Sequence, residues 1–158
     1  MISEAITASL PELRKYMSFA QTPPTPEDCE IELRRDLAAF ILRERIMFQI
    51  FSIQQNNFIG EIGFRRLNWS TPKFETSYWL DSRQAGKGYM TEALRTTTRF
   101  AFESLSARRV ELHCDSRNIG SRRVAEKAGF ELEGILRSDM TREDNSSADG
   151  CVFAQIRS

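Results

Sequence analysis

The feature that most constrains the fold is a strand–helix–strand pattern over residues 74–114. "FETSYWL" (74–80) alternates apolar and polar side chains as a strand does, and "RRVELHC" (108–114) repeats that alternation. Between them, one face of a helical pattern over 90–105 carries Met90, Leu94, Thr97, Ala101 and Leu105. Two strands joined through a helix lie parallel in one sheet, so the pattern predicts a sheet with helices packed on it.

Further strand patterns occupy four segments outside this unit, namely 46–53, 58–67, 130–138 and 150–157. The turn "QQNN" joins the first two into a predicted hairpin, and the polar loop 141–149 joins the last two. Phenylalanine accounts for 11 residues. We expect six of them, which fall in periodic segments, to lie in the core: Phe40, Phe48, Phe51, Phe64, Phe100 and Phe130.

Three more helices are predicted. The first carries Ile6, Leu10, Leu13 and Met17 at helical spacing. The second follows the Pro-rich "QTPPTPED", with Thr25 as N-cap and Pro26 as first residue, and its apolar stripe contains Leu33, Leu37, Phe40 and Ile41. The third is short, with Asn118 as its cap and Gly129 just past its end. With no repeat and no linker composition, we expect a single α/β domain over residues 1–158.

Composition excludes several classes of protein. Lys and Arg total 22 and Asp and Glu total 22, which argues against a large footprint for nucleic acid or an anionic membrane. No apolar run approaches the roughly 20 residues that span a bilayer, and no secretory signal is visible at the N-terminus. Cys29, Cys114 and Cys151 are odd in number and lack metal-ligand spacing. We therefore expect free thiols, no metal site and a cytoplasmic location.

The stretch "SRQAGKGYMTEA" (82–93) combines a Gly-rich turn after a strand with the start of a helix. Such a turn presents unpaired N–H groups and the positive end of a helix dipole, which together bind phosphate. Gly86 and Gly88 allow close backbone approach, and Arg83, Lys87 and Thr91 can add charge and a hydroxyl. The spacing matches neither the P-loop nor the Rossmann fingerprint. An exposed turn with only local roles for its glycines remains the alternative.

Several motifs in order resemble those of the GNAT superfamily of N-acetyltransferases. "RQAGKGYMTEA" after "YWL" resembles its pyrophosphate-binding segment, "FIGEIGF" its third strand and "ETSYWLD" its fourth. "ELHCDSRNIGSRRVAEKAGFELEGILR" resembles its fifth strand, fourth helix and sixth strand. "GKGYMTEA", "N-x-x-S-x-x-V-A-E-K-x-G-F" and "L-E-G-x-L-R" are similar to the RimJ/RimL-type ribosomal-protein acetyltransferases. The resemblance runs from Phe58 to Ile156. It implies the GNAT fold, a mixed central sheet flanked by helices, here without the usual first strand.

The resemblance implies that acetyl-CoA donates an acetyl group to an amine that attacks it directly. It assigns the pyrophosphate to the turn and helix start, that is Arg83, Gln84, Ala85, Gly86, Lys87, Gly88, Tyr89, Met90 and Thr91. It also implies that Tyr78, Trp79 and Leu80 pair with the pantetheine arm. Asn118 would face that arm, and Ser121 would lie near the thioester sulfur and donate to the departing thiolate.

The resemblance leaves the catalytic base open. RimL-type enzymes often carry a Glu at the position of Met140, and Asp139 one residue earlier points to the opposite face of a strand. Glu75 and Glu61, on two neighbouring strands, are therefore the candidates for the catalytic base. His113 is expected to be structural, because no partner for this lone histidine is visible in the sequence.

The acceptor is also open. An α-amine has a pKa of about 7.7–8.0 and a Lys side chain about 10.4, so an N-terminus is the more available nucleophile. This favours a protein N-terminus of the ribosomal-protein type over a lysine, while a small amine remains possible. Candidate acceptor contacts are the "PPTP" loop, Trp69 and the loop 141–149. A catalytically silent acyl-CoA-binding sensor or scaffold is the alternative function, an unrelated α/β binding domain is a third, and a homodimer is possible.

Overall fold

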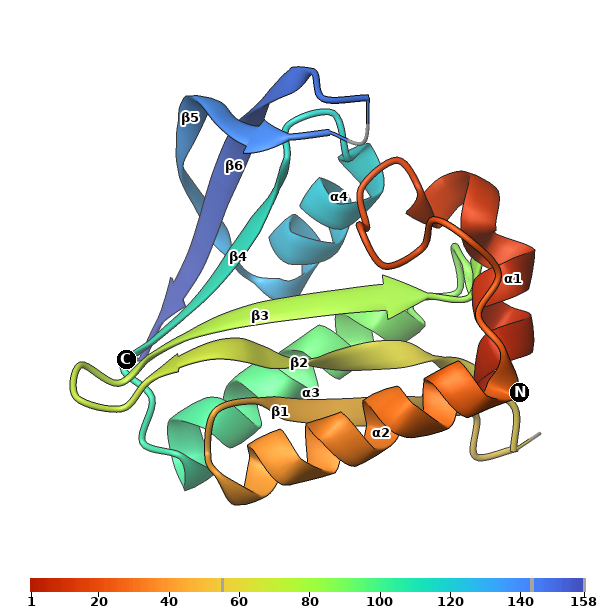
Figure 1. The fold of residues 1–158 in the computed structure, drawn as a ribbon. Coiled ribbons are helices and arrows are strands. Elements are labelled where there is room, and N and C mark those ends of the chain that lie inside the picture. Colours follow the sequence, from red (N-terminus) through yellow and green to blue (C-terminus); the bar gives the residue numbers. More distant parts are fainter. Residues whose placement is uncertain (55, 143, 158) are drawn as a thin grey trace.

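The computed structural model describes residues 1–54, 56–142 and 144–157, and within them the chain forms six strands, four α-helices and one short 3-10 helix (Figure 1). The helices are α1 (Ile2–Leu13), α2 (Pro26–Ile41), η1 (Ser82–Gln84), α3 (Tyr89–Ser104) and α4 (Ile119–Ala128). The strands are β1 (Ile46–Phe51), β2 (Phe58–Asn68), β3 (Lys73–Leu80), β4 (Arg109–Asp115), β5 (Glu131–Thr141) and β6 (Ser147–Ile156). All six predicted strands and all four predicted α-helices are confirmed.

The strands form one sheet in the order β1-β2-β3-β4-β6-β5. β3 and β4, which α3 connects, are parallel, and every other neighbouring pair is antiparallel. This confirms the mixed sheet expected from the strand–helix–strand pattern, because a crossover helix returns the chain to the same end of the sheet.

Helices cover both faces of the sheet (Figure 1). α3 and α4 pack on one face, where the larger core contains Phe64, Phe74, Leu94 and Phe153, all fully buried. α1 packs on the other face, where its apolar side chains meet Phe58 and Trp79 in a second cluster. The alternation of β3 explains the division, since Phe74 and Tyr78 face α3 while Trp79 faces α1.

The centre of the sheet is split. Among the described residues, β3 pairs with β4 only over a short stretch, in which Lys73–Thr76 of β3 lie opposite Arg109–Leu112 of β4. Beyond Thr76, β3 continues to Leu80 paired with β2 alone, while β4 stays paired with β6 as far as Asp115. The two strands therefore diverge into a V, which Figure 1 shows between β3 and β4. Past Thr76, the edge of β3 that faces the split has no ladder partner among the described strands.

Some boundaries differ from the sequence prediction. β5 extends to Thr141 and β6 begins at Ser147, so much of the predicted loop 141–149 is paired, with Met140 opposite Ala148. Backbone groups alone form a ladder, so polar side chains at the end of a hairpin do not exclude it. α1 ends at Leu13, before Met17. Residues 55 and 143, within the predicted turn and loop, lie outside the described residues.

The prediction that six phenylalanines form the core is wrong for half of them. Phe64 and Phe130 are buried and Phe48 is half-buried, but Phe40, Phe51 and Phe100 are 54%, 45% and 37% exposed. α2 forms as predicted, with a reciprocal cap between Thr25 and Asp28, yet it buries none of its residues. Its apolar side chains stay exposed because β1 is the last strand at this edge and no described element lies over α2.

Within the described residues, no helix combines the length and apolar character that crossing a membrane requires. The same residues contain no cluster of side chains suited to a metal ion. The three cysteines are free thiols, with Cys114 and Cys151 buried.

Candidate active site

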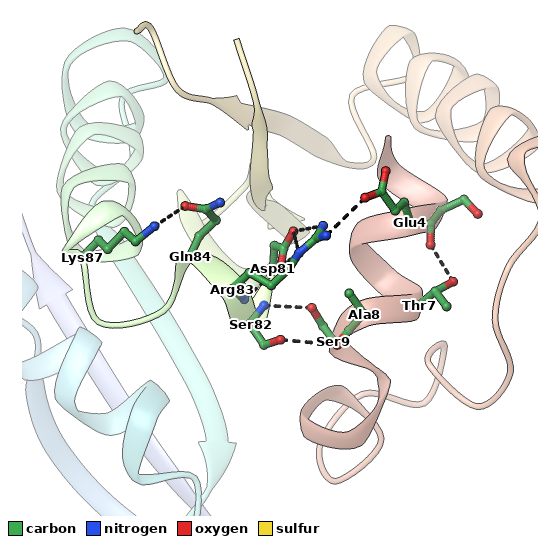
Figure 2. A network of polar contacts seen from close by, with 10 residues as sticks. Glu4, Thr7, Ala8, Ser9, Asp81, Ser82, Arg83, Gln84 and Lys87 are labelled. Carbon is green, nitrogen blue, oxygen red and sulfur yellow. Dashed lines mark hydrogen bonds and ion pairs between the residues drawn. The ribbon is translucent and has the colours of Figure 1, made fainter. Parts of the chain in front are cut away.

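The turn after β3 is anchored to α1. Figure 2 shows the guanidinium of Arg83 against Asp81 (2.7 Å) and reaching Glu4 of α1 (3.2 Å). The N–H of Ser82 donates to Ser9 Oγ at 2.8 Å. Burial alone would raise the pKa of Asp81, but the hydrogen bonds and charge of Arg83 outweigh it and hold that pKa below its ordinary value. The Arg83 charge is thus engaged at the base of the turn.

Among the described residues, the next six N–H groups have no acceptor. The N–H groups of Arg83, Gln84 and Ala85 donate to Asp81 or Ser82. From Gly86 to Thr91, by contrast, no acceptor lies among the described residues, because these groups precede the first intrahelical bond of α3. Gly86 and Gly88 have φ of +77° and +86°, which an L side chain rarely adopts. The segment 86–91 therefore presents unpaired donors at the positive end of a helix, a site for an anion.

A cavity of about 520 Å³ runs from this turn into the split of the sheet. The sequence-predicted residues that line it are Tyr78, Trp79, Leu80, Gln84, Ala85, Gly86, Gly88, Tyr89, Met90, Thr91, Asn118 and Ser121. The side chains of Arg83 and Lys87 are not part of this lining, and Lys87 Nζ instead donates to Gln84 Oε1 at 2.8 Å (Figure 2).

Two cations that sequence reasoning missed supply positive charge to this cavity. Arg123 and Lys127 line it from α4. They are four residues apart, so they share one face of the helix, and this spacing after the Asn118 cap was the available signal. Their position beside the 86–91 donors strengthens the preference for an anion.

Ser121 lines the cavity beside Tyr78 and Asn118. Asn118 caps α4 by accepting from the Ser121 N–H at 3.0 Å, so the cap fixes the position of the serine. The Ser121 hydroxyl is 3.0 Å from the Tyr78 hydroxyl and also contacts the Cys114 thiol. Burial raises the pKa of Tyr78 and raises that of Cys114 to about 11. Both neighbours therefore stay protonated near neutral pH, and Ser121 lines the cavity together with Tyr78.

A second cavity of about 360 Å³ meets the first at Tyr78, Asn118 and Ser121. Its lining includes Met17, Ser18 and Gln21 between α1 and α2, Ser77 and His113 on the sheet, and Met140, Thr141 and Arg142 near the end of β5. Arg14, Lys15 and Arg65 add positive charge, whereas Asp115 is paired with Arg142 at 2.8 Å. Trp69 is absent from this lining, so of the predicted acceptor contacts the 141–149 loop is the one represented.

The two proposed carboxylate bases lie apart from Ser121. Glu61 lines a third cavity of about 490 Å³, accepts from Gln49 at 3.0 Å, and has a pKa raised by burial. Glu75 pairs with Arg66 at 3.4 Å and lines none of the three cavities. Met140 lines the second cavity and Asp139 does not, as the strand register predicts.

Both the sequence comparison and the fold comparison find acetyltransferases. The Escherichia coli ribosomal-protein-serine acetyltransferase is 35% identical over 125 residues, which are 79% of this chain and 69% of that protein. The probable N-acetyltransferase YjcK of Bacillus subtilis is 39% identical over 98 residues, 61% of this chain, and the match spans 54% of YjcK.

Among solved structures, the microcin C7 self-immunity acetyltransferase MccE, in complex with acetyl-CoA and AMP, superimposes with a TM-score of 0.90 at 18% identity. That match covers 99% of this chain and 85% of MccE. The ribosomal L7/L12 α-N-protein acetyltransferase RimL, in complex with coenzyme A, gives a TM-score of 0.88 at 22% identity over 98% of this chain and 86% of RimL. The family described as acetyltransferase (GNAT) domain matches residues 3–131, and the chain therefore belongs to the GNAT acetyltransferase family.

Proposed function

We propose that this chain transfers the acetyl group of acetyl-CoA to an amine. The observation that carries the proposal is the cavity at the split between β3 and β4, whose lining includes residues of the 86–91 donor segment as well as Ser121. An elongated ligand with an anionic end and amide groups along its length suits that arrangement. Acetyl-CoA has a pyrophosphate, two amides and a reactive thioester in that order, and the complexes of MccE and RimL contain it or coenzyme A.

Different residues of the cavity bind different parts of acetyl-CoA. The 86–91 donors, with Arg123 and Lys127, hold the pyrophosphate, while the open edge of Tyr78, Trp79 and Leu80 pairs with the pantetheine amides. Asn118 fixes Ser121, whose hydroxyl donates to the departing sulfur. Acetyl-CoA supplies the activated carbonyl.

Transfer is direct, without an acetyl-cysteine. Cys114 contacts Ser121 and is the thiol that lines the second cavity, but burial raises its pKa to about 11. Since the thiolate is the nucleophile, a thiol that is protonated near neutral pH does not compete with an incoming amine. The amine enters through the second cavity, which reaches Ser121 from the side of α1.

The acceptor is a protein N-terminal α-amine of the ribosomal-protein type. An α-amine is far more often neutral than a lysine near pH 7.5, and the similar Escherichia coli enzyme is a ribosomal-protein-serine acetyltransferase. Arg14, Lys15 and Arg65 line the acceptor cavity, so an acidic side chain near the N-terminus of the acceptor is favoured and a basic one is disfavoured.

A peptide panel tests the function. Peptides with a free N-terminus and either Asp or Lys at the second position are incubated with acetyl-CoA, and the products are identified by mass spectrometry. Matched peptides with a blocked N-terminus and one lysine are the control. Acetylation of the free α-amine, fastest with the acidic peptide, supports the proposal.

The alternative, a silent acyl-CoA-binding module, predicts a different result. Acetyl-CoA then stabilises the protein against thermal unfolding, by about 2.7 kcal/mol at 100 times its Kd, but no amine in the panel is acetylated. Acetylation of small amines with no transfer to any peptide would place the acceptor in a different chemical class.

A further inference from the structure

His113, the only histidine of the chain, lies where the sheet opens. Leu112 is the last residue of β4 paired with β3, so His113 is the first that borders the split. Its side chain lines the second cavity together with Ser77 and Ser121. The side chain is 30% exposed while Nε2 is buried, so the accessible part of the ring is the edge away from Nε2.

His113 and Ser121 lie on opposite sides of the split. Cys114 packs in the α3 and α4 core and contacts Ser121, so its neighbour His113 points to the α1 face. A thioester held between β3 and β4 would have its sulfur near Ser121 and its other side toward His113. An amine that enters through the second cavity arrives on the His113 side.

Glu111 gives the histidine a partner that the sequence did not reveal. Its Oε2 is 3.4 Å from His113 Nε2, while Arg109 (2.6 Å) and Lys73 (3.3 Å) hold the same carboxylate. Burial would raise the pKa of Glu111, but these two cations outweigh it and keep that pKa below its ordinary value. Nε2 makes no hydrogen bond to any described residue, but the ionised carboxylate beside it favours the tautomer with its proton on Nε2, which leaves the lone pair on Nδ1.

No other described side chain of this cavity is placed to act as a base. The titratable or charged groups that face the same space are Arg14, Lys15 and Tyr16 of the α1 end, Arg65 of β2, Tyr78 of β3, Cys114 and Asp115 of β4, and Arg142 beyond β5. Asp115 is paired with Arg142 and accepts from the Arg117 N–H. Burial raises the pKa of both Tyr78 and Cys114, so they keep their protons; the Tyr16 hydroxyl donates to the Arg117 carbonyl at 3.3 Å, and the remaining groups are cations.

We propose that His113, positioned by Glu111, is the general base that takes the proton from the attacking amine, an inference that rests on the proposed acetyl transfer. The neutral amine nitrogen bonds to the acetyl carbon, and the C–S bond breaks with its electron pair going to sulfur. The nitrogen proton passes to His113 Nδ1. The sulfur receives a proton from Ser121, which regains one from solvent, and His113 releases its proton to solvent.

The first test compares steady-state kinetics of His113→Gln with wild type and with Glu131→Gln, an exposed β5 control. His113→Gln is expected to lower kcat by about 10²-fold or more, to leave the acetyl-CoA Kd unchanged, and to abolish the acidic limb of the pH profile. Glu131→Gln should match wild type. A His113→Gln enzyme with wild-type kcat and an unchanged acidic limb would overturn the proposal.

Glu111→Gln separates the roles of the two residues. Without the carboxylate the tautomer with a free Nδ1 is no longer favoured, so kcat should fall by less than in His113→Gln while the acetyl-CoA Kd stays unchanged. A purely structural role for Glu111 would lower Tm and leave the kcat of the folded protein unchanged, and that result would contradict the dyad.

A readout without activity keeps the two proposals distinguishable. As the only histidine, His113 has assignable ring resonances in NMR spectra. A conjugate of CoA and a peptide N-terminus, joined through the acetyl carbon, should shift these resonances and their titration midpoint. If the wild-type protein acetylates no amine, the proposed acetyl transfer is wrong, but the NMR measurement still tests whether His113 lies beside the bound amine. Unchanged ring signals with the bound conjugate would overturn the placement of His113.

Discussion

Ser121 and His113 line the same cavity beside the split of the sheet, but of the two only Ser121 was predicted from the sequence to be catalytic. Ser121 follows Asn118 by three residues, and the cap that this spacing predicts is present at 3.0 Å. His113 was expected to be structural because its partner was not visible. The partner is Glu111, only two residues away, but its proximity to the ring depends on strand geometry and side-chain rotamers.

The direction of the Arg83 side chain could not be predicted from the sequence either. Its place in the Gly-rich turn suggested a phosphate contact, but the side chain points back to Asp81 and Glu4. A buried carboxylate needs a partner, and Asp81 is 1% exposed. The two cations that line the cavity, Arg123 and Lys127, come instead from a helix about 40 residues further along the chain.

Ser121→Ala is expected to lower kcat by about 10²-fold without changing the acetyl-CoA Kd, because the hydroxyl acts only as the sulfur departs. Thiol release measured at saturating acetyl-CoA gives kcat, and calorimetry gives Kd. Tyr78→Phe, which removes only the hydroxyl next to Ser121, is the matched comparison and should have a smaller effect. Full activity in Ser121→Ala would remove this residue from the mechanism.

Asp81 should contribute to acid sensitivity. Its folded pKa is below the unfolded value of 3.8, so its stabilisation is present above that value and is lost as pH falls through the lower folded pKa. Asp81→Asn should lower the free energy of unfolding at pH 7 and flatten its decline at acid pH, as measured by urea titration. Glu4→Gln, which removes the exposed partner of Arg83, is the control and should leave the curve nearly unchanged.

The start of α3 is the element on which the cofactor proposal depends. Sequence reasoning found it because glycines before a helix and after a strand form a recognisable signal. The predicted pyrophosphate donors began at residue 83, but the unpaired N–H groups begin at Gly86, because those of residues 83–85 already donate to Asp81 or Ser82. A 3-10 turn stabilised by a side-chain cap from Asp81 has no distinct sequence signature.

Gly88→Ala tests the left-handed start of α3. An alanine at φ +86° is strained by about 1–2 kcal/mol, so stability should fall by that amount and acetyl-CoA binding should weaken. Gly134→Ala is the matched control, because Gly134 lacks a positive φ and a Cβ there would meet nothing within 4 Å. Equal effects of the two substitutions on Tm and Kd would contradict a special role for the turn.

α2 shows where periodicity predicts an element without predicting its burial. Its cap and apolar stripe identified the helix correctly, but burial depends on what lies over β1. Leu37→Gln should therefore change the free energy of unfolding by less than about 0.5 kcal/mol. Leu94→Ala in the α3 core, where Leu94 is fully buried, should cost about 2–5 kcal/mol. A large loss in Leu37→Gln, measured by urea unfolding, would mean that α2 is covered in solution.

At the scale of the whole molecule, the topology followed from the order of strand and helix patterns, because a crossover helix leaves few alternatives. The split between β3 and β4, which forms the site, could not be predicted from that order. Pairing of β4 with β6 over its whole length, and of β3 with β2 to Leu80, parts the central strands, and this is a property of the assembled sheet. The family resemblance implied a pantetheine groove, and the structure shows the open strand edge that could form one.

The central claim is that acetyl-CoA lies in this split with its pyrophosphate at 86–91. The most direct measurement is a titration of ¹⁵N-labelled protein with acetyl-CoA, followed by the backbone amide resonances. We predict the largest shifts at Gly86–Thr91, where amides gain acceptors, and further shifts at Tyr78–Leu80 on the open edge of β3. Saturable shifts elsewhere with these two segments unmoved, or no shifts in the folded protein, would contradict the account.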